Sequence, residues 1–550
     1  MSRWNIFARS GSLRFLVLGA FILSGAGVFS ANATQAPPAS PVYGDVRIEG
    51  SLGEPSNLIP PLSSDTASSQ VTGHMYISLL RYNRNLEIET EAAESYAVLD
   101  DGLRLRFTLR KDLFWEDGRP LGVDDVEFTF RLMIDPSTPT AYAGDYLRVK
   151  EFRRLDERSF EVTYEKPYAR ALISWMLSIL PRHALEHADL RTTPLRRAPV
   201  GSGPFRLKSW EPGSRLTLLA NELYFKGRPR LDGLVVRLIP DLSTMFMELR
   251  AGKLDAAGLT PQQYVYQTGE GDFGDRYNIY SYLGLGYVFM GYNLRSPLFS
   301  DKRVRQAFAM AVNKDDIING VLFGQGLPVI GPYMPGSWVY NEGIRPYPHD
   351  PEAASALLAE CGWRKGPDGL LTRDGRPFEF TILVNQGNEQ RTKIAVIIQS
   401  HLKRLGVVAH IRTVEWAAFL NDFVNKGYFD ALILGWSTTL DPDLHSVWHS
   451  SNSFEGGLNF VGFSNVEVDE LIEAGRSTFD EEARKKYYGR IQEILHEEQP
   501  YMFLYAPYAF SAVHRRFQGL DPVPVLGVEH NLPEWWVPEE RQLYRNLLKP

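Results

Sequence analysis

Strand and helix patterns alternate along residues 301–505, and this alternation constrains the fold more than any other feature of the chain. The expected elements are a helix from Asp350 to Gly362, a strand at 378–384, a helix that ends at Gly406, and strands at 407–414 and 429–434. A β-α-β order predicts a sheet covered by helices. Such sheets bind ligands in a crevice beyond the carboxyl ends of their strands. We therefore expect an α/β lobe with a site at one end of its sheet.

The preceding part of the chain is richer in strands. Apolar and polar residues alternate over residues 103–109, which predicts a half-buried strand, and Asp124 is a predicted N-cap for the helix that follows. Strand–turn–strand patterns fill residues 81–198, and residues 199–285 mix strands with one helix. We expect this part to form a further lobe with an extra β-rich subdomain at about 81–198.

Length and composition require more than one domain. A single hydrophobic core stops growing near ~250–300 residues, and this chain has 550 residues, of which 44% are hydrophobic. The lone cysteine, Cys361, excludes an intramolecular disulfide, so packing must supply the stability. A net charge of −7 in a well-mixed sequence argues against nucleic acid as a partner.

The first 33 residues have the pattern of a secretory signal peptide. Three arginines precede an apolar run at 15–29, and Ala31-Asn32-Ala33 has the small-x-small form of a cleavage site. The run is shorter than the roughly 20 residues that span a bilayer, and an uncleaved anchor is the alternative. Thr34, not a cysteine, follows the site, so we expect no lipid anchor and a free periplasmic protein. Residues 34–41 are proline-rich and predicted to be a flexible lead-in.

Five segments carry a resemblance to a known family. They lie at residues 99–130, 199–210, 292–315, 435–443 and 459–471. In this order they are similar to segments of the family 5 extracellular solute-binding proteins, the periplasmic dipeptide-, oligopeptide- and nickel-binding receptors of ABC importers. One match of this kind would mean little, but five in the family's order make the resemblance strong.

The resemblance implies a two-lobe periplasmic-binding-protein fold of type II. Lobe I is expected at 42–285 with a returning tail at 511–550, lobe II at 291–505, and the chain would cross between them near 287–293 and 503–508. A receptor of this family binds a peptide or peptide-like solute between its lobes and presents it to an inner-membrane ABC permease. We expect a monomer without a cofactor and without enzymatic activity.

The resemblance also places the ligand contacts. Trp436 would lie in the cleft, on a loop after the last predicted strand, and Gly435 and Ser437 would offer backbone groups to an extended ligand. Trp416 and Tyr292 are further aromatic residues that are candidates to line the cleft.

Two charged anchors of the peptide-binding members are missing. In those members an aspartate three residues after the tryptophan pairs with the ligand's α-amino group, and here the position holds Thr439. The arginine that binds the ligand carboxylate in dipeptide receptors falls near Asn385. Asp441 and Arg391 are the nearest groups of the required charges. We predict weak recognition of free peptide termini, and as ligand a longer or blocked peptide or a non-peptide solute stacked on Trp436.

Other chemistry has weaker support in the sequence. Asp441, Asp443, His445 and His449 have spacings found in metal sites, but Asp-Pro-Asp is a common turn of the family, and we expect no metal. No nucleophile motif stands in a catalytic context. Two alternatives stay open: a receptor that hands its ligand to a membrane sensor, and a periplasmic hydrolase that uses the same cleft.

Overall fold

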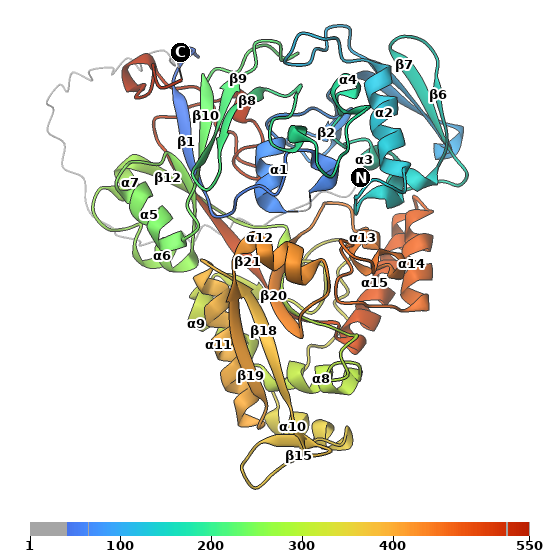
Figure 1. Ribbon diagram of the computed structural model, residues 1–550, viewed down its shortest axis with the longest axis vertical. Coiled ribbons are helices and arrows are strands. Elements are labelled where there is room, and N and C mark those ends of the chain that lie inside the picture. The colour runs from blue at the N-terminus through green and yellow to red at the C-terminus, as the bar shows by residue number, and fades with distance from the viewer. Residues whose placement is uncertain (1–40, 64, 524–525, 549–550) are drawn as a thin grey trace, which may run out of the picture. The chain divides into compact units, whose positions relative to one another are not determined.

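Strand β21 (Tyr501–His514) joins the two lobes of the fold. The computed structural model describes residues 41–63, 65–523 and 526–548, and in them a 12-stranded mixed sheet extends to both sides of β21 (Figure 1). The first half of β21 pairs with strands of one lobe and its second half with strands of the other. The mixed α/β, two-lobe fold expected from the sequence is confirmed.

Lobe I denotes residues 41–283 together with 508–548. Its part of the sheet runs from β21 through β11, β1, β10 and β9 to β8, and β12 also pairs with β21. The bounds are β1 (Val46–Ser51), β8 (Phe205–Glu211), β9 (Arg215–Ala220), β10 (Gly233–Leu238), β11 (Ala256–Leu259) and β12 (Tyr277–Leu283). The helices are α1 (Thr66–Thr72), α5 (Leu242–Arg250), α6 (Pro261–Tyr266) and α7 (Phe273–Arg276).

An extra β-rich subdomain lies within lobe I. Its elements are β2 (Leu80–Tyr82), β3 (Ile88–Thr90), β4 (Ala93–Leu99), β5 (Arg104–Leu109), β6 (Val149–Arg154), β7 (Ser159–Tyr164), α2 (Val123–Ile134), α3 (Ala171–Ser174) and α4 (Arg182–Leu185). As the alternation predicted, Leu105, Phe107 and Leu109 of β5 are buried. The predicted cap of α2 was wrong by two residues, because Gly122 is the N-cap and its N–H donates to the carboxylate of Asp125 over 3.0 Å.

Lobe II denotes residues 286–507. Its strands are β13 (Gly286–Tyr292), β14 (Gly326–Pro328), β18 (Glu379–Asn385), β19 (Val408–Val414) and β20 (Ala431–Ser437), with a small separate sheet of β15 (Arg364–Lys365), β16 (Leu371–Arg373) and β17 (Arg376–Pro377). Its helices are α8 (Lys302–Ala311), α9 (Lys314–Leu322), α10 (Pro351–Glu360), α11 (Glu389–Arg404), α12 (Trp416–Ala418), α13 (His445–Trp448), α14 (Val466–Arg476) and α15 (Glu481–Glu498).

Both faces of the lobe II sheet are covered, which explains its continuous apolar strands. Along β20, Ile433 belongs to the core on the side of α8 and α11, whereas Leu432 and Leu434 belong to the core on the side of α15. Strands β18, β19 and β20 run parallel, with α11 as the crossover between β18 and β19. Their carboxyl ends therefore meet at one edge of the sheet, as the β-α-β pattern predicted.

The chain passes between the lobes at two places. The first is the short segment 283–286, before β13, and the second is the Pro507–Tyr508 bond inside β21. Residues 287–292, expected at the first crossing, pair along β13 with β20 and so belong to the lobe II sheet. The second crossing lies inside the predicted range 503–508.

The signal peptide predicted at 1–33 and nearly all of the lead-in at 34–41 lie outside the described residues. Among the residues that the structure does describe, no helix combines the length and the apolar character needed to cross a membrane.

Glu116 is a partly buried carboxyl group beside Gly201. Its Oε2 atom is buried, and no described residue hydrogen-bonds to it. Burial raises the pKa of Glu116 to about 7, so the folded protein binds more protons than the unfolded chain between about pH 4.5 and pH 7. Stability is therefore lost as pH rises through this range. We expect Glu116→Gln to raise the free energy of unfolding by about 1–3 kcal/mol at pH 8 and to leave it unchanged at pH 4. Urea unfolding at both pH values tests this, and an equal gain at both would contradict it.

Candidate functional site

The carboxyl end of β20 carries the three residues predicted to form a ligand-binding loop. Gly435, Trp436 and Ser437 pair in register with β13 and so continue the strand. Trp436 is half-buried and Ser437 is exposed, whereas the residues from Ala431 to Leu434 are buried. The prediction of a loop was wrong, because backbone pairing extends the strand past the point where its apolar pattern ends.

The ladder between β18 and β20 stops before this strand end. Its register consists of Ile382 opposite Ala431 and Leu383 opposite Leu432. Continuing that register would place Asn385 beside Leu434. The carboxyl ends of the two strands are therefore not paired with each other, and this unpaired stretch is called the gap.

The backbone groups of Gly435 and Ser437 face this gap. On the other edge of β20 the N–H of Thr438 donates to the carbonyl of Leu285 over 3.0 Å. Successive residues of a strand direct their backbone groups to opposite edges, so those of Gly435 and Ser437 point away from β13. None of the described strands pairs with them there. This edge of β20 therefore has no strand partner among the described residues.

Arg391, near the start of α11, lies beside the same gap. Its Nη1 donates to Oδ1 of the buried Asn385 over 2.7 Å. No carboxylate of the described residues lies within ion-pair distance of Arg391, and burial lowers its pKa to about 10. The group stays charged at neutral pH, so the site contains a positive charge that lacks a protein counter-ion.

Two tryptophans border the region. The ring of Trp436 stacks on Phe460 with 5.8 Å between ring centroids, and its Nε1 donates to the hydroxyl of Tyr501 over 3.3 Å. Trp416 stacks on Phe419 and faces lobe I, where a Cβ at Gly53 would lie 3.7 Å from its ring. Trp416 thus lies where the lobes meet, and its role in contacting a ligand stays a prediction.

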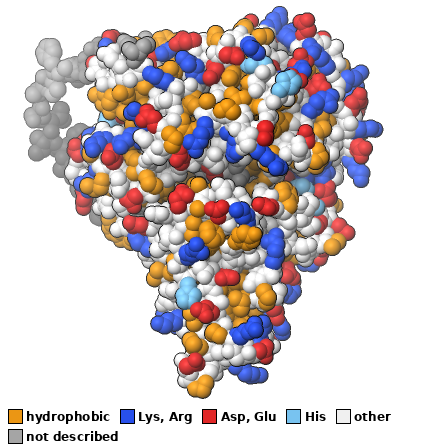
Figure 2. Space-filling model, in the orientation of Figure 1, with side chains coloured by type: hydrophobic (Ala, Val, Ile, Leu, Met, Phe, Trp, Pro, Cys, Tyr) orange, Lys and Arg blue, Asp and Glu red, His pale blue; other side chains and the backbone are white. Residues whose placement is uncertain are grey.

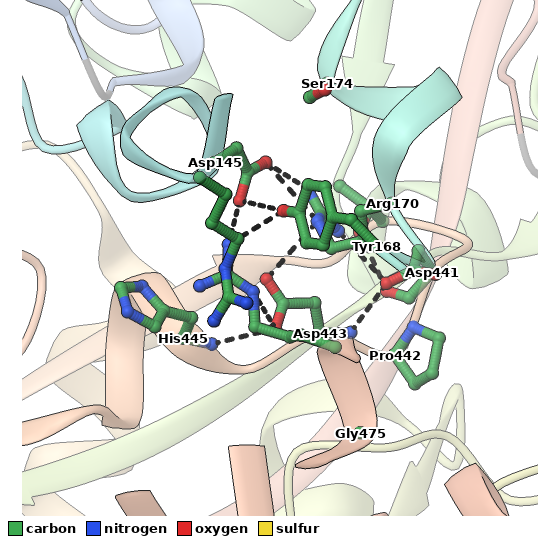
Figure 3. Close-up of polar contacts among 12 residues, drawn as sticks. Asp145, Tyr168, Arg170, Ser174, Asp441, Pro442, Asp443, His445 and Gly475 are labelled. Carbon is green, nitrogen blue, oxygen red and sulfur yellow. Dashed lines mark hydrogen bonds and ion pairs between the residues drawn. The ribbon is translucent and has the colours of Figure 1, made fainter. Parts of the chain in front are cut away.

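The acidic loop is the segment 438–444 after β20, which contains Asp441 and Asp443. Arginines already neutralise its carboxylates. Thr439 is exposed, and its hydroxyl donates to the carbonyl of Asp441 over 2.9 Å. The carboxylate of Asp441 is buried beside Arg170 at 3.1 Å (Figure 3) and is also paired with Arg484 at 2.8 Å. Asp441 therefore cannot serve as the replacement anchor for a ligand ammonium group. Arg170 was missed by sequence reasoning, since nothing local marks a residue 271 positions away as its partner.

Tyr292 does not lie near the gap. It is fully buried in lobe II, where its ring packs against Phe299 at a centroid distance of 4.9 Å and against Phe308. Its expected role in lining the cleft was wrong, because the side chain points into the core between β13 and α8.

A cavity of about 310 Å³ lies between the lobes on the side of α5, α6, α9 and α11. Its lining is rich in amides and hydroxyls and consists of Leu242, Ser243, Phe246, Met247, Thr260, Gln262, Gln263, Gln267, Val321, Glu389, Gln390 and Lys393. None of the predicted ligand residues lines it. Figure 2 shows a hollow along the boundary of the two lobes on the face that it presents.

Two histidines suggest metal binding or catalysis, and their contacts support neither. The ligand atoms of His445, His449 and Glu473 lie within 4.8 Å of one another. Arg148 and Arg476 already pair with the Glu473 carboxylate, and their positive charges oppose a cation there. The Nδ1 atom of His449 faces both Ser451 Oγ at 2.8 Å and Asp469 at 3.9 Å. A hydrolase base must join nucleophile and carboxylate through different ring nitrogens, so this is no triad.

Comparison with known proteins gives consistent matches over nearly the whole chain. Oligopeptide-binding protein AppA of Bacillus subtilis is 33% identical over 538 residues, which cover 95% of this chain and 97% of AppA. Heme-binding protein A of Haemophilus influenzae is 30% identical over 499 residues, 86% of this chain and 88% of that protein.

Solved structures also match nearly the whole chain. AppA in complex with a nonapeptide has a TM-score of 0.86 at 31% identity and covers 91% of this chain and 100% of that one. NikZ from Campylobacter jejuni in complex with Ni(L-His) has a TM-score of 0.82 at 27% identity, with 90% of this chain and 100% of that one covered. Residues 87–457 match the model of the family described as bacterial extracellular solute-binding proteins, family 5. The chain belongs to the family 5 bacterial extracellular solute-binding proteins.

Proposed function

We propose that this protein is the periplasmic substrate-binding component of an ABC importer, which binds a peptide or peptide-like solute between its lobes and delivers it to the inner-membrane permease. Membership of the family and the similarity to AppA and to dipeptide-binding protein of Escherichia coli support a peptide-binding receptor. Secretion by a cleaved signal peptide and action as a monomer are part of the same proposal.

The free edge of β20 is the observation that carries the proposal. A peptide in extended conformation can pair with the unpartnered backbone groups of Gly435 and Ser437 as an added strand. Main-chain hydrogen bonds of this kind give affinity without depending on the ligand's side chains. The half-buried faces of Trp436 and Trp416 would supply apolar contact area.

The charges of the site favour one end of the peptide. Arg391 offers a positive charge without a protein counter-ion, which suits the carboxyl terminus of a ligand. At the other end, Thr439 carries no charge and Asp441 is held by two arginines. We therefore propose a ligand with a free carboxylate and without a required free amino group, which revises the prediction from sequence that both free termini are recognised weakly.

A calorimetric panel of peptides tests this. The mature protein should bind tri- to pentapeptides with a free carboxylate, and N-acetylation should change the affinity little, whereas C-terminal amidation should weaken binding. Loss of binding on acetylation alone would show that a carboxylate anchors the ligand's amino group after all. Absence of binding by every peptide in the panel would overturn the peptide proposal.

Thr439→Asp tests the missing amine anchor directly. Because Thr439 is exposed at the end of the free strand, a carboxylate there would face the ligand rather than the core. We expect tighter binding of free-amino dipeptides by about 1–2 kcal/mol, the range of a hydrogen bond to a charged group, and no change for the acetylated forms. Thr439→Asn is the control, because asparagine has the shape of aspartate without its charge. Equal gains in the two variants would contradict an electrostatic role.

A further inference from the structure

Eight charged side chains meet where the extra subdomain of lobe I faces the loop after β20. From lobe I come Asp145, Arg148 and Arg170; from lobe II come Asp441, Asp443, Glu473, Arg476 and Arg484. Asp441, Arg476 and Arg484 are buried, with Arg476 0% exposed, and the other five are partly buried. Figure 3 shows Asp441 and Asp443 directed toward Arg170, with Asp145 on the opposite side of the group.

The ion pairs cross the lobe boundary in both directions. Arg170 of lobe I reaches Asp441 at 3.1 Å and Asp443 at 3.3 Å in lobe II. In return, Arg476 of lobe II pairs with Asp145 of lobe I and donates to the hydroxyl of Tyr168 over 2.8 Å. A backbone hydrogen bond of 2.9 Å from the N–H of Ala169 to the carbonyl of Arg476 joins the same two segments. The two lobes are thus in direct polar contact through this cluster.

Nearly every member also has a partner within its own lobe. Arg170 lies 3.1 Å from Asp145, and Arg484 lies 2.8 Å from Asp441. Arg476 lies 3.5 Å from Asp443. If the lobes separate, these pairs can stay together while the faces become hydrated, so opening leaves no buried charge without a partner. The large free-energy cost of breaking a buried ion pair comes from leaving one charge buried without a partner. Opening of the lobes avoids this cost.

The two faces are complementary in charge. The lobe I group has two arginines and one aspartate, so its formal charge is +1, and the lobe II group has three carboxylates and two arginines, so its formal charge is −1. Closing brings these opposite charges together and leaves a neutral cluster. The attraction acts between the lobes and needs no third component.

We propose that these eight side chains form a reversible electrostatic latch that holds the lobes closed without a ligand, with Arg170 as its central group. The proposal rests on the proposed function, in which a solute binds between the two lobes, but it makes no use of the ligand's identity. It also gives the acidic loop a different role, because Asp441 and Asp443 then bind a cation supplied by lobe I instead of one supplied by the solute.

Small-angle X-ray scattering of the ligand-free mature protein tests the latch. Protein refolded from denaturant to remove bound solute should have the scattering profile of the closed structure. Arg170→Gln leaves Asp441 and Asp443 with only their own-lobe partners, and we expect the ratio of closed to open molecules to fall roughly ten- to hundredfold. The radius of gyration should increase accordingly, and salt should increase that of the wild type in the same direction.

Two further variants make the result decisive. Arg158→Gln, in the same subdomain but paired with Glu94 on the surface, is the matched control and should leave the radius unchanged. Arg148→Gln removes only the outer pair with Glu473 and should give a smaller increase in the radius of gyration. This variant tests the latch if Arg170→Gln fails to fold. An unchanged radius in a folded Arg170→Gln or Arg148→Gln protein, or a wild type that is already open without ligand, would overturn the latch. An expanded Arg170→Gln protein with no peptide binding by the wild type would instead refute only the proposed function.

Discussion

Replacing Arg391 with glutamine is expected to weaken the binding of peptides with a free carboxyl terminus by about 2–5 kcal/mol, the cost of removing one partner of a desolvated charge pair. This corresponds to a roughly 30- to several-thousandfold increase in Kd. The reason is that Arg391 has Asn385 as its side-chain acceptor and no carboxylate partner in the described structure. Burial lowers its pKa to about 10, so it remains a cation at the pH of the assay. Titration calorimetry of wild type and variant with one tripeptide measures the difference.

The ligand's carboxylate and a neighbouring lysine supply the controls. An amidated peptide should bind wild type and Arg391→Gln with nearly equal affinity, because the charge that Arg391 neutralises is gone. Lys393→Gln removes a positive charge two residues further along α11, where the side chain is half exposed and paired with Glu389. Its effect should stay within about 0.5 kcal/mol. An equal loss for acid and amide, or a large effect of Lys393→Gln, would show that Arg391 does not bind the carboxylate.

Much of the fold could be predicted because its signals are local. Asp350 and Gly362 delimit α10 as predicted, with Asp350 accepting from the backbone of Ala353 and Gly362 at a φ of +85°. Strands β18 and β20 of lobe II appear in the sequence as apolar runs because both faces of the sheet are buried there. The error at Gly435–Ser437 arose where pairing with β13, which has no signature in the side chains of β20, extends the strand.

The charges of the site could be predicted only in part. Arg391 was recognised as the nearest cation to Asn385, but its lack of a counter-ion depends on which carboxylates fold around it. Asp441 looked available in the sequence, and it is unavailable because Arg170, from a different lobe, lies 3.1 Å away. Contacts between segments hundreds of residues apart leave no periodicity or spacing in a single sequence. For the same reason Tyr292, an aromatic residue next to a crossing, could not be distinguished from a cleft residue until its packing on Phe299 was known.

The largest effect on stability is expected from Arg516, which holds the end of β21 in lobe I. Its side chain is 2% exposed and pairs with the buried carboxylates of Asp45 and Asp255, with Nε and Nη2 at 2.9 and 2.7 Å from the oxygens of Asp255. Arg516→Met leaves two buried carboxylates without their cation, and we expect the free energy of unfolding to fall by about 3–5 kcal/mol. Urea unfolding followed by circular dichroism measures the loss.

Removing the carboxylates together with the arginine separates charge from packing. In the triple variant Asp45→Asn, Asp255→Asn and Arg516→Met no charge remains buried, so we expect it to recover most of the stability that Arg516→Met alone loses, since neutral replacement of a whole buried ion cluster is often tolerated. Arg541→Met, an exposed position in the same returning tail, should change stability by no more than about 0.5 kcal/mol. If the triple variant is as unstable as Arg516→Met, the side chain of Arg516 stabilises the end of β21 through its shape and its 2.8 Å hydrogen bond to the carbonyl of Val46 rather than through its charge.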